Sequence, residues 1–227
     1  ETLRTQGQKA FLPFVTAGDP NLEFTGKVLK ELVARGANLC ELGIPYSDPI
    51  ADGPVIQASY TRVLDQKQKL AHILEAAETW TAELSVPIVS MVSYSIIHRQ
   101  GLENYVARAK AAGIAGAIVP DLLVEESAAF SEICRREDFS LIQLVTPTTP
   151  RDRALQICET STGFLYFVSV TGITGERTEL PPEVVDQVGW LKARTNLPIC
   201  IGFGISQPEH VRMLAPVADG LIVGSAI

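Results

Sequence analysis

Eight short apolar runs are the feature of the sequence that most restricts its fold. They cover residues 10–16, 39–43, 87–93, 115–119, 140–145, 164–169, 198–201 and 220–223. Between them, apolar residues recur at helical spacing over 22–35, 55–64, 70–84, 102–112, 124–137, 152–160, 182–194 and 208–214. Near-continuous apolar strands that alternate with helices are typical of a parallel sheet covered by helices. A count of eight strands predicts a closed (β/α)₈ barrel of the TIM type, an α/β fold.

No linker interrupts this alternation, so we expect a single barrel domain over residues 1–227. With 227 residues, of which 46% are hydrophobic, the chain has enough length for one substantial core. The last unit ends at Ile227 with no helix after it. We therefore expect the final helix of the barrel to be absent from this chain.

Charge and cysteine usage narrow the class of protein. The formal net charge is −7 and the only basic cluster is Arg135-Arg136, which argues against a nucleic-acid partner or an anionic membrane surface. Four cysteines without paired spacing predict buried free thiols. No apolar stretch reaches the length of a membrane span and no secretion signal opens the chain. We expect a cytoplasmic protein, with the plastid stroma as the alternative.

The segment over residues 40–54 contains the strongest chemical signal. Glu41 lies in an apolar strand, where poor solvation should raise its pKa toward the range useful for proton transfer. Asp52 follows in a proline-rich loop, where we expect better solvation and an ionised carboxylate. Two carboxylates in unlike environments often supply one acid and one base. The alternative is that Glu41 pairs with an arginine, while Asp48 and Asp52 cap turns.

Three glycine-containing loops follow the last three strands, at residues 171–175, 202–206 and 224–226. In a barrel of this type the chemistry lies at the carboxyl ends of the strands, and glycines there let backbone N–H groups approach a phosphate. The first loop is long enough to close over a ligand. A dinucleotide fingerprint is the rival interpretation of Gly202-Phe203-Gly204, but Gln207 occupies the place of the third glycine.

The sequence lacks the residues that several classes of reaction require. No lysine ends a strand, which argues against a Schiff-base aldolase. The three histidines show no metal-ligand spacing, and no nucleophile motif for acyl transfer is present. What remains is acid–base catalysis by carboxylates on a small phosphorylated ligand. The aromatic and apolar residues Phe14, Ile50, Tyr94, Tyr166 and Phe203 are candidates for the walls of its pocket.

Five strings carry a resemblance to a known family. FVTAGDP, ELGIPYSDPIADGP, TGITG, GFGIS and GSAI occur in this order from Phe14 to Ile227. In order and spacing they closely resemble the tryptophan synthase alpha subunit. The resemblance implies retro-aldol cleavage of indole-3-glycerol phosphate to indole and glyceraldehyde 3-phosphate, in tryptophan biosynthesis. It also implies a beta subunit as partner and no cofactor in this subunit.

The resemblance assigns roles by matched string. Glu41 would be the general acid/base, Asp52 would accept the indole N–H, and Tyr166 would stand near the reacting carbons. Thr174 would belong to the closing loop over Gly172–Leu180. The resemblance implies phosphate binding by Gly175, Gly204, Gly224 and Ser225. With Thr174, and with Phe14, Tyr94 and Phe203 as the aromatic candidates named above, they make up the expected substrate- and phosphate-binding residues.

Two places depart from the family pattern. Tyr94 is followed by Ser95 and Ile96 where the family usually has Asn and Pro, and Leu123 replaces a proline. Both places resemble family surfaces that meet the beta subunit, so we hypothesise an altered or weakened contact. The alternatives are a stand-alone paralogue that releases indole, a catalytically idle barrel that acts as a partner subunit, and another phosphate-binding barrel enzyme such as an isomerase.

Overall fold

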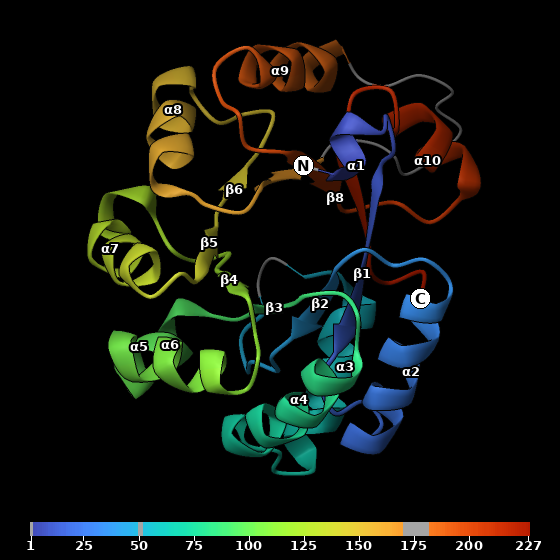
Figure 1. Cartoon of the computed structure of the whole chain (residues 1–227), viewed down its shortest axis with the longest axis vertical. Coiled ribbons are helices and arrows are strands. Elements are labelled where there is room, and N and C mark those ends of the chain that lie inside the picture. The colour runs from blue at the N-terminus through green and yellow to red at the C-terminus, as the bar shows by residue number, and fades with distance from the viewer. Residues whose placement is uncertain (1, 50–51, 170–181) are drawn as a thin grey trace.

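The computed structural model describes residues 2–49, 52–169 and 182–227, which form a ring of parallel strands enclosed by helices (Figure 1). The strands are β1 Ala10–Thr16, β2 Cys40–Gly43, β3 Ile88–Met91, β4 Gly116–Ile118, β5 Ser140–Ile142, β6 Leu144–Val145, β7 Leu165–Val168, β8 Ile199–Gly202 and β9 Gly220–Val223. Their order in the sheet is β5-β4-β3-β2-β1-β9-β8-β7-β6. The predicted (β/α)₈ barrel is confirmed.

The fifth predicted strand, over residues 140–145, is split in the structure. Its first part, β5, pairs with β4, and its second part, β6, pairs with β7. Between them Gln143 is buried, and its Nε2 donates a hydrogen bond to Thr160 Oγ1 at 2.6 Å. One run of chain therefore changes partner at Gln143 and connects the two halves of the barrel.

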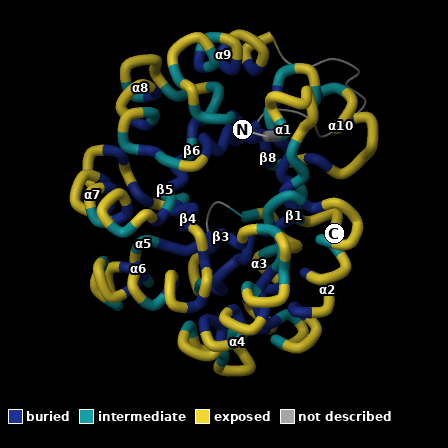
Figure 2. Tube along the Cα trace, viewed as in Figure 1, coloured by how far each residue is buried: buried dark blue, intermediate teal, exposed yellow. Residues whose placement is uncertain are grey.

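The helices lie outside the strands, and Figure 2 shows exposed outer faces around a buried ring. They are α1 Thr2–Thr5, α2 Leu22–Ala34, α3 Pro54–Asp65, α4 Leu70–Glu83, α5 Tyr94–Gln100, α6 Leu102–Ala111, the 3₁₀ helix η1 Val124–Glu126, α7 Ala128–Arg136, α8 Arg151–Thr160, α9 Pro182–Lys192 and α10 Pro208–Leu214. The sequence predicted neither α1 nor α5, and it merged η1 with α7.

Strand β2 shows how the barrel positions a polar group. Alternate side chains of a strand point to opposite faces. Cys40 and Leu42 pack in the outer apolar layer against the helices, so Glu41 between them points into the barrel. The inner layer is also apolar, and its members include Phe14, opposite Glu41 in the register of β1, and Val89, opposite it in β3. The fold therefore places a carboxyl group inside an apolar core.

Candidate active site

Glu41 is the most unusual group of the barrel interior. Its side chain is fully buried, and neither carboxyl oxygen has a hydrogen-bond partner among the described residues. Burial alone raises its pKa well above the ordinary range, because the charged form has lost its solvation. The alternative of an arginine partner has no support in the described part of the chain. Glu41 thus keeps its proton to a higher pH than an exposed glutamic acid does.

Asp52 lies at the mouth of the barrel, just before α3. Its backbone is fixed, because its carbonyl oxygen accepts a hydrogen bond from Gln57 Nε2 at 2.7 Å and its N–H donates to the Pro49 carbonyl at 3.1 Å. The residue is half-buried, and this burial raises the pKa of its carboxyl group. The Asp52 carboxyl group is therefore less solvated than the sequence predicted. Asp52 and Glu41 differ in the extent of burial.

Tyr166 on β7 points into the barrel and lies close to both acids. Its hydroxyl oxygen occupies the space over Gly202, where an added Cβ would lie 2.4 Å from it. Burial, followed by the negative charges of Glu41 and Asp52, raises the pKa of Tyr166 well above its usual value. The ring of Phe203 packs edge-on against it, with the ring centres 6.1 Å apart. The phenol is therefore held as a neutral group between the two acids and the glycine loops.

One pocket gathers most of the predicted site residues, and we call it the glycine pocket. It is lined by Phe14, Asp52, Gly53, Ile56, Met91, Tyr166, Phe203, Gly204, Ile205, Ile222, Gly224 and Ser225. Phe203 and Gly204 both have positive φ, 73° and 74°, which gives the loop after β8 a sharp turn. The loops after β8 and β9 thus meet on the same side of the barrel mouth as Asp52 and Tyr166.

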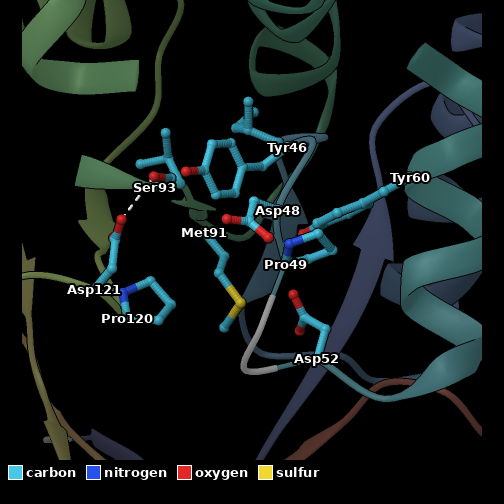
Figure 3. Close-up of a pocket in the computed structure, with 11 residues that line it drawn as sticks. Tyr46, Asp48, Pro49, Asp52, Tyr60, Met91, Ser93, Pro120 and Asp121 are labelled. Atoms are coloured by element: carbon cyan, nitrogen blue, oxygen red, sulfur yellow. Dashed lines mark hydrogen bonds between the residues drawn. The ribbon is translucent and has the colours of Figure 1, made fainter. Parts of the chain in front are cut away.

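A second pocket adjoins the first, and we call it the acid pocket (Figure 3). It is lined by Ile44, Tyr46, Asp48, Pro49, Asp52, Tyr60, Met91, Val92, Ser93, Pro120 and Asp121. Asp52 and Met91 line both pockets, which therefore form one continuous mouth. Ser93 Oγ donates a hydrogen bond to Asp121 Oδ2 at 2.7 Å, the dashed line in Figure 3.

The sequence did not indicate Tyr60, Met91 or Asp121 as pocket residues. Two signals were available. Asp121 lies two residues after the fourth apolar run, and Tyr60 lies four residues after Ile56, on the same face of a helix. Met91 ends a strand in an unremarkable apolar run, so its place could not be read from the sequence.

Other predicted residues lie elsewhere. The ring of Tyr94 packs beside Phe130, at 6.4 Å between ring centres, and beside His98, at 6.1 Å. It lines neither pocket. Ile50, Thr174, Gly175 and the predicted closing loop lie outside the described residues. Within the described ranges, no group of three or more His, Cys, Asp or Glu side chains could hold a metal ion.

The protein family of the chain follows from a match to a family model. Residues 1–227 match the model described as tryptophan synthase alpha chain. The chain belongs to the tryptophan synthase alpha chain family. The resemblance of its five strings to that family is thereby confirmed.

Relatives and solved structures agree with this assignment. The tryptophan synthase alpha chain of Rhodopirellula baltica is 61% identical over 230 residues, which cover 100% of this chain and 83% of that protein. The Arabidopsis thaliana protein of the same name is 43% identical, over 99% of this chain and 82% of the relative. The structure of the alpha subunit from Legionella pneumophila has a TM-score of 0.90 at 34% identity, covering 99% of this chain and 84% of that chain.

Another similar solved structure is that of a complex. A chain from the tryptophan synthase a2b2 complex of Pyrococcus furiosus has a TM-score of 0.89 at 39% identity, covering 96% of this chain and 88% of that chain. The residues at which the sequence suggested a departure from the family pattern are accessible: Ser95 is exposed, Ile96 is half-buried, and Leu123 is 53% exposed.

Proposed function

We propose that this protein is a carbon–carbon lyase that cleaves indole-3-glycerol phosphate to indole and glyceraldehyde 3-phosphate, as the alpha subunit of tryptophan synthase. Membership of the family supports the reaction. The observation that carries it in this chain is the Glu41 carboxyl group. It is buried without a partner among the described residues, and it lies next in register to Phe14, which lines the glycine pocket. Such a site offers a proton where a small phosphorylated ligand would lie.

In the proposed mechanism Glu41 gives its proton to the indole ring carbon that carries the glycerol chain. Asp52 accepts a hydrogen bond from the indole N–H and stabilises the positive charge that develops on the protonated ring. The glycerol hydroxyl then loses its proton, with help from the ionised Glu41. The carbon–carbon bond breaks, its electron pair returns to the indole, and the chain leaves as an aldehyde. Glu41 regains from the glycerol hydroxyl a proton to replace the one that it gave to the ring, so the proposed reaction needs no cofactor.

The glycine pocket would hold the rest of the substrate. Gly204, Gly224 and Ser225 line this pocket, and we propose that their backbone N–H groups bind the phosphate, together with Thr174 and Gly175. Tyr166 would stand beside the reacting carbons, with Phe14 and Phe203 as apolar walls.

The proposed reaction is tested by incubating the purified chain with indole-3-glycerol phosphate. We expect indole and glyceraldehyde 3-phosphate to form in equal amounts. Neither product would form if the barrel is catalytically idle, and a rearranged phosphate ester without free indole would indicate an isomerase.

We also propose a beta subunit as partner, since a solved relative belongs to an a2b2 complex. The departures at Ser95, Ile96 and Leu123 favour a contact that is altered in this chain. They keep open the second candidate function, a stand-alone enzyme that releases indole with little dependence on a beta subunit. Measuring the cleavage rate with and without added beta subunit separates the two.

For location, we propose the cytoplasm or the plastid stroma. All four cysteines are free thiols. Three of them are buried, as predicted, and Cys158 is half-buried. Free thiols persist in reducing compartments. No helix within the described ranges combines the length and apolarity that a membrane crossing needs.

A further inference from the structure

Tyr60 is a second buried tyrosine of the mouth, and the proposed mechanism does not use it. It lies on α3, is 3% exposed and lines the acid pocket. Its ring belongs to the inner apolar cluster together with Phe14 and Met91. Its hydroxyl oxygen lies over Gly43, where an added Cβ would be 2.9 Å away. The phenol is therefore fixed at both ends, by packing of the ring and by the close approach at Gly43.

The Tyr60 hydroxyl makes no hydrogen bond to another described residue. Tyr105 is the natural comparison, because it is equally buried but lies in the outer layer. Its hydroxyl is 2.8 Å from Ser90 Oγ and is thereby satisfied. A buried hydroxyl normally finds a partner. The Tyr60 hydroxyl instead borders the pocket, where a partner can reach it.

Two acids of the site lie near this hydroxyl. Gly43 follows Glu41 by two residues, on the same face of β2, so Tyr60 lies one layer above the buried acid. Asp52 precedes α3 and lines the same pocket as Tyr60 (Figure 3). Burial, followed by the charges of Asp52 and then Glu41, raises the pKa of Tyr60 far above neutrality. The hydroxyl thus remains protonated and can donate a hydrogen bond.

Donors are scarce around Asp52. The titratable side chains that face this mouth are Glu41 on β2, Tyr46 and Asp48 on the loop after β2, Tyr60 on α3, Asp121 after β4 and Tyr166 on β7. Among the described residues that line the two pockets there is no lysine, arginine or histidine. An ionised Asp52 therefore depends on neutral donors, and the fixed phenol of Tyr60 is one that lines its pocket.

We propose that Tyr60 is a positioning residue whose hydroxyl donates a hydrogen bond to the ionised Asp52 carboxylate and keeps it ready to accept the indole N–H. The role in indole binding rests on the proposed function. The two side chains are not hydrogen-bonded to each other in this structure, and catalytic hydrogen bonds often tighten only when the substrate binds. Because the donor stabilises the charged form of Asp52, it lowers the pKa of that carboxyl group.

The test compares Tyr60→Phe with Tyr105→Phe, which removes a hydroxyl of equal burial outside the mouth. In Tyr60→Phe we expect the pKa of Asp52 to rise by about 1, equivalent to roughly a tenfold weaker preference for the charged form. Carboxyl ¹³C NMR titration measures this, with the Asp52 signal identified by its loss in Asp52→Asn. The acidic limb of the kcat/KM profile should move upward by the same amount, and Tyr105→Phe should change neither quantity.

A double-mutant cycle separates an action through Asp52 from direct substrate contact. If Tyr60 acts through Asp52, Tyr60→Phe lowers kcat by about tenfold in the unmutated background but has little effect in Asp52→Asn. Equal losses in both backgrounds, or an unchanged pKa of Asp52, would overturn the proposal. The titration needs no turnover, so it decides this inference even for a chain that releases no indole, which would refute only the proposed function.

A second variant retains the hydroxyl in case Tyr60→Phe does not fold. 3-Fluorotyrosine placed at position 60 alone keeps the ring and is a stronger hydrogen-bond donor. We expect it to lower the pKa of Asp52, and an unchanged or raised value would contradict the proposed hydrogen bond.

Discussion

Glu41 is tolerated inside the barrel because it can stay neutral. An unpaired carboxylate in an apolar interior is far more costly than the protonated acid, so the pKa rises until the acid holds its proton. This ties the chemistry of the site to the stability of the fold. A residue that is poised to transfer a proton also makes the folded state sensitive to pH.

The first prediction concerns Glu41→Gln and stability. The folded pKa of Glu41 lies above its unfolded value of about 4.3, so the folded chain binds more protons between these two values. The stabilising effect of the neutral acid is full below the unfolded pKa and is lost as pH rises through the folded pKa. We expect Glu41→Gln to remove this loss, which reaches about 1.4 kcal/mol per pH unit.

Urea unfolding of both proteins across this pH range measures the difference. Glu132→Gln serves as the control, because Glu132 is exposed on α7. The control should leave the pH dependence of the free energy of unfolding unchanged. Parallel curves for Glu41→Gln and the unmutated chain would mean that Glu41 is solvated or paired in solution.

The residues that the sequence could place are those that end strands. Glu41, Gly204, Gly224 and Ser225 follow from the rule that strand ends gather at one edge of a barrel. The direction of Tyr94 did not follow, because its ring is placed by packing against α7. Tyr60 was missed for a related reason, because it reaches the mouth only through the packing of α3 against the barrel.

Strands and helices were predictable where the burial of one face gives the element a clear pattern of apolar residues in the sequence. Strand β9 and helix α10 have the predicted bounds, Gly220–Val223 and Pro208–Leu214. The break at Gln143 was not predictable, because it reflects a change of strand partner rather than a local signal. Helix α5 was missed because it is short, with a Ser93 cap at its start and Gly101, at φ 84°, as its end.

A second prediction follows from the packing of β2 against its neighbours. In Gly43→Ala the new Cβ would lie 2.3 Å from Phe14 Cζ and 2.9 Å from the Tyr60 hydroxyl oxygen. Both rings are buried, so we expect a loss of about 1–3 kcal/mol in the free energy of unfolding, together with reduced activity.

Gly189→Ala is the matched control for this substitution. Gly189 lies in α9, and an added Cβ would meet no other described residue within 4 Å. Alanine should therefore stabilise the helix by about 0.5–1 kcal/mol. Denaturant unfolding distinguishes the two variants, and equal effects would contradict the tight packing over Gly43.

The two joined pockets lie near Ser95, Ile96 and Leu123, the positions at which we propose an altered contact with the beta subunit. Ser95 lies one residue after Tyr94, whose N–H donates to Asp121 of the acid pocket, and Leu123 lies two residues after Asp121. An altered partner surface can thus border an unaltered reaction site. This arrangement allows the cleavage reaction and its dependence on a partner to change separately.

A third prediction tests this separation with Leu123→Pro. The φ of Leu123 is −72°, close to the value that proline requires, and its N–H makes no hydrogen bond to another described residue. We expect a change of at most about 0.5 kcal/mol in the free energy of unfolding, because the backbone already fits. Affinity for the beta subunit should rise about tenfold, or roughly 1.4 kcal/mol.

Isothermal titration with a tryptophan synthase beta subunit measures this affinity. Leu123→Ala is the control, since it removes the exposed side chain without adding proline. Equal affinities for all three proteins would show that position 123 does not shape the contact.

The most direct measurement is the rate of indole release from indole-3-glycerol phosphate by Glu41→Gln and by the unmutated chain. Glutamine keeps the size of the side chain but cannot transfer the proton. We expect release to fall by about 10²–10⁴-fold, the usual contribution of one acid–base group, with the fold retained. Indole release at an equal rate by the two proteins would contradict the proposed role of Glu41 as the proton donor.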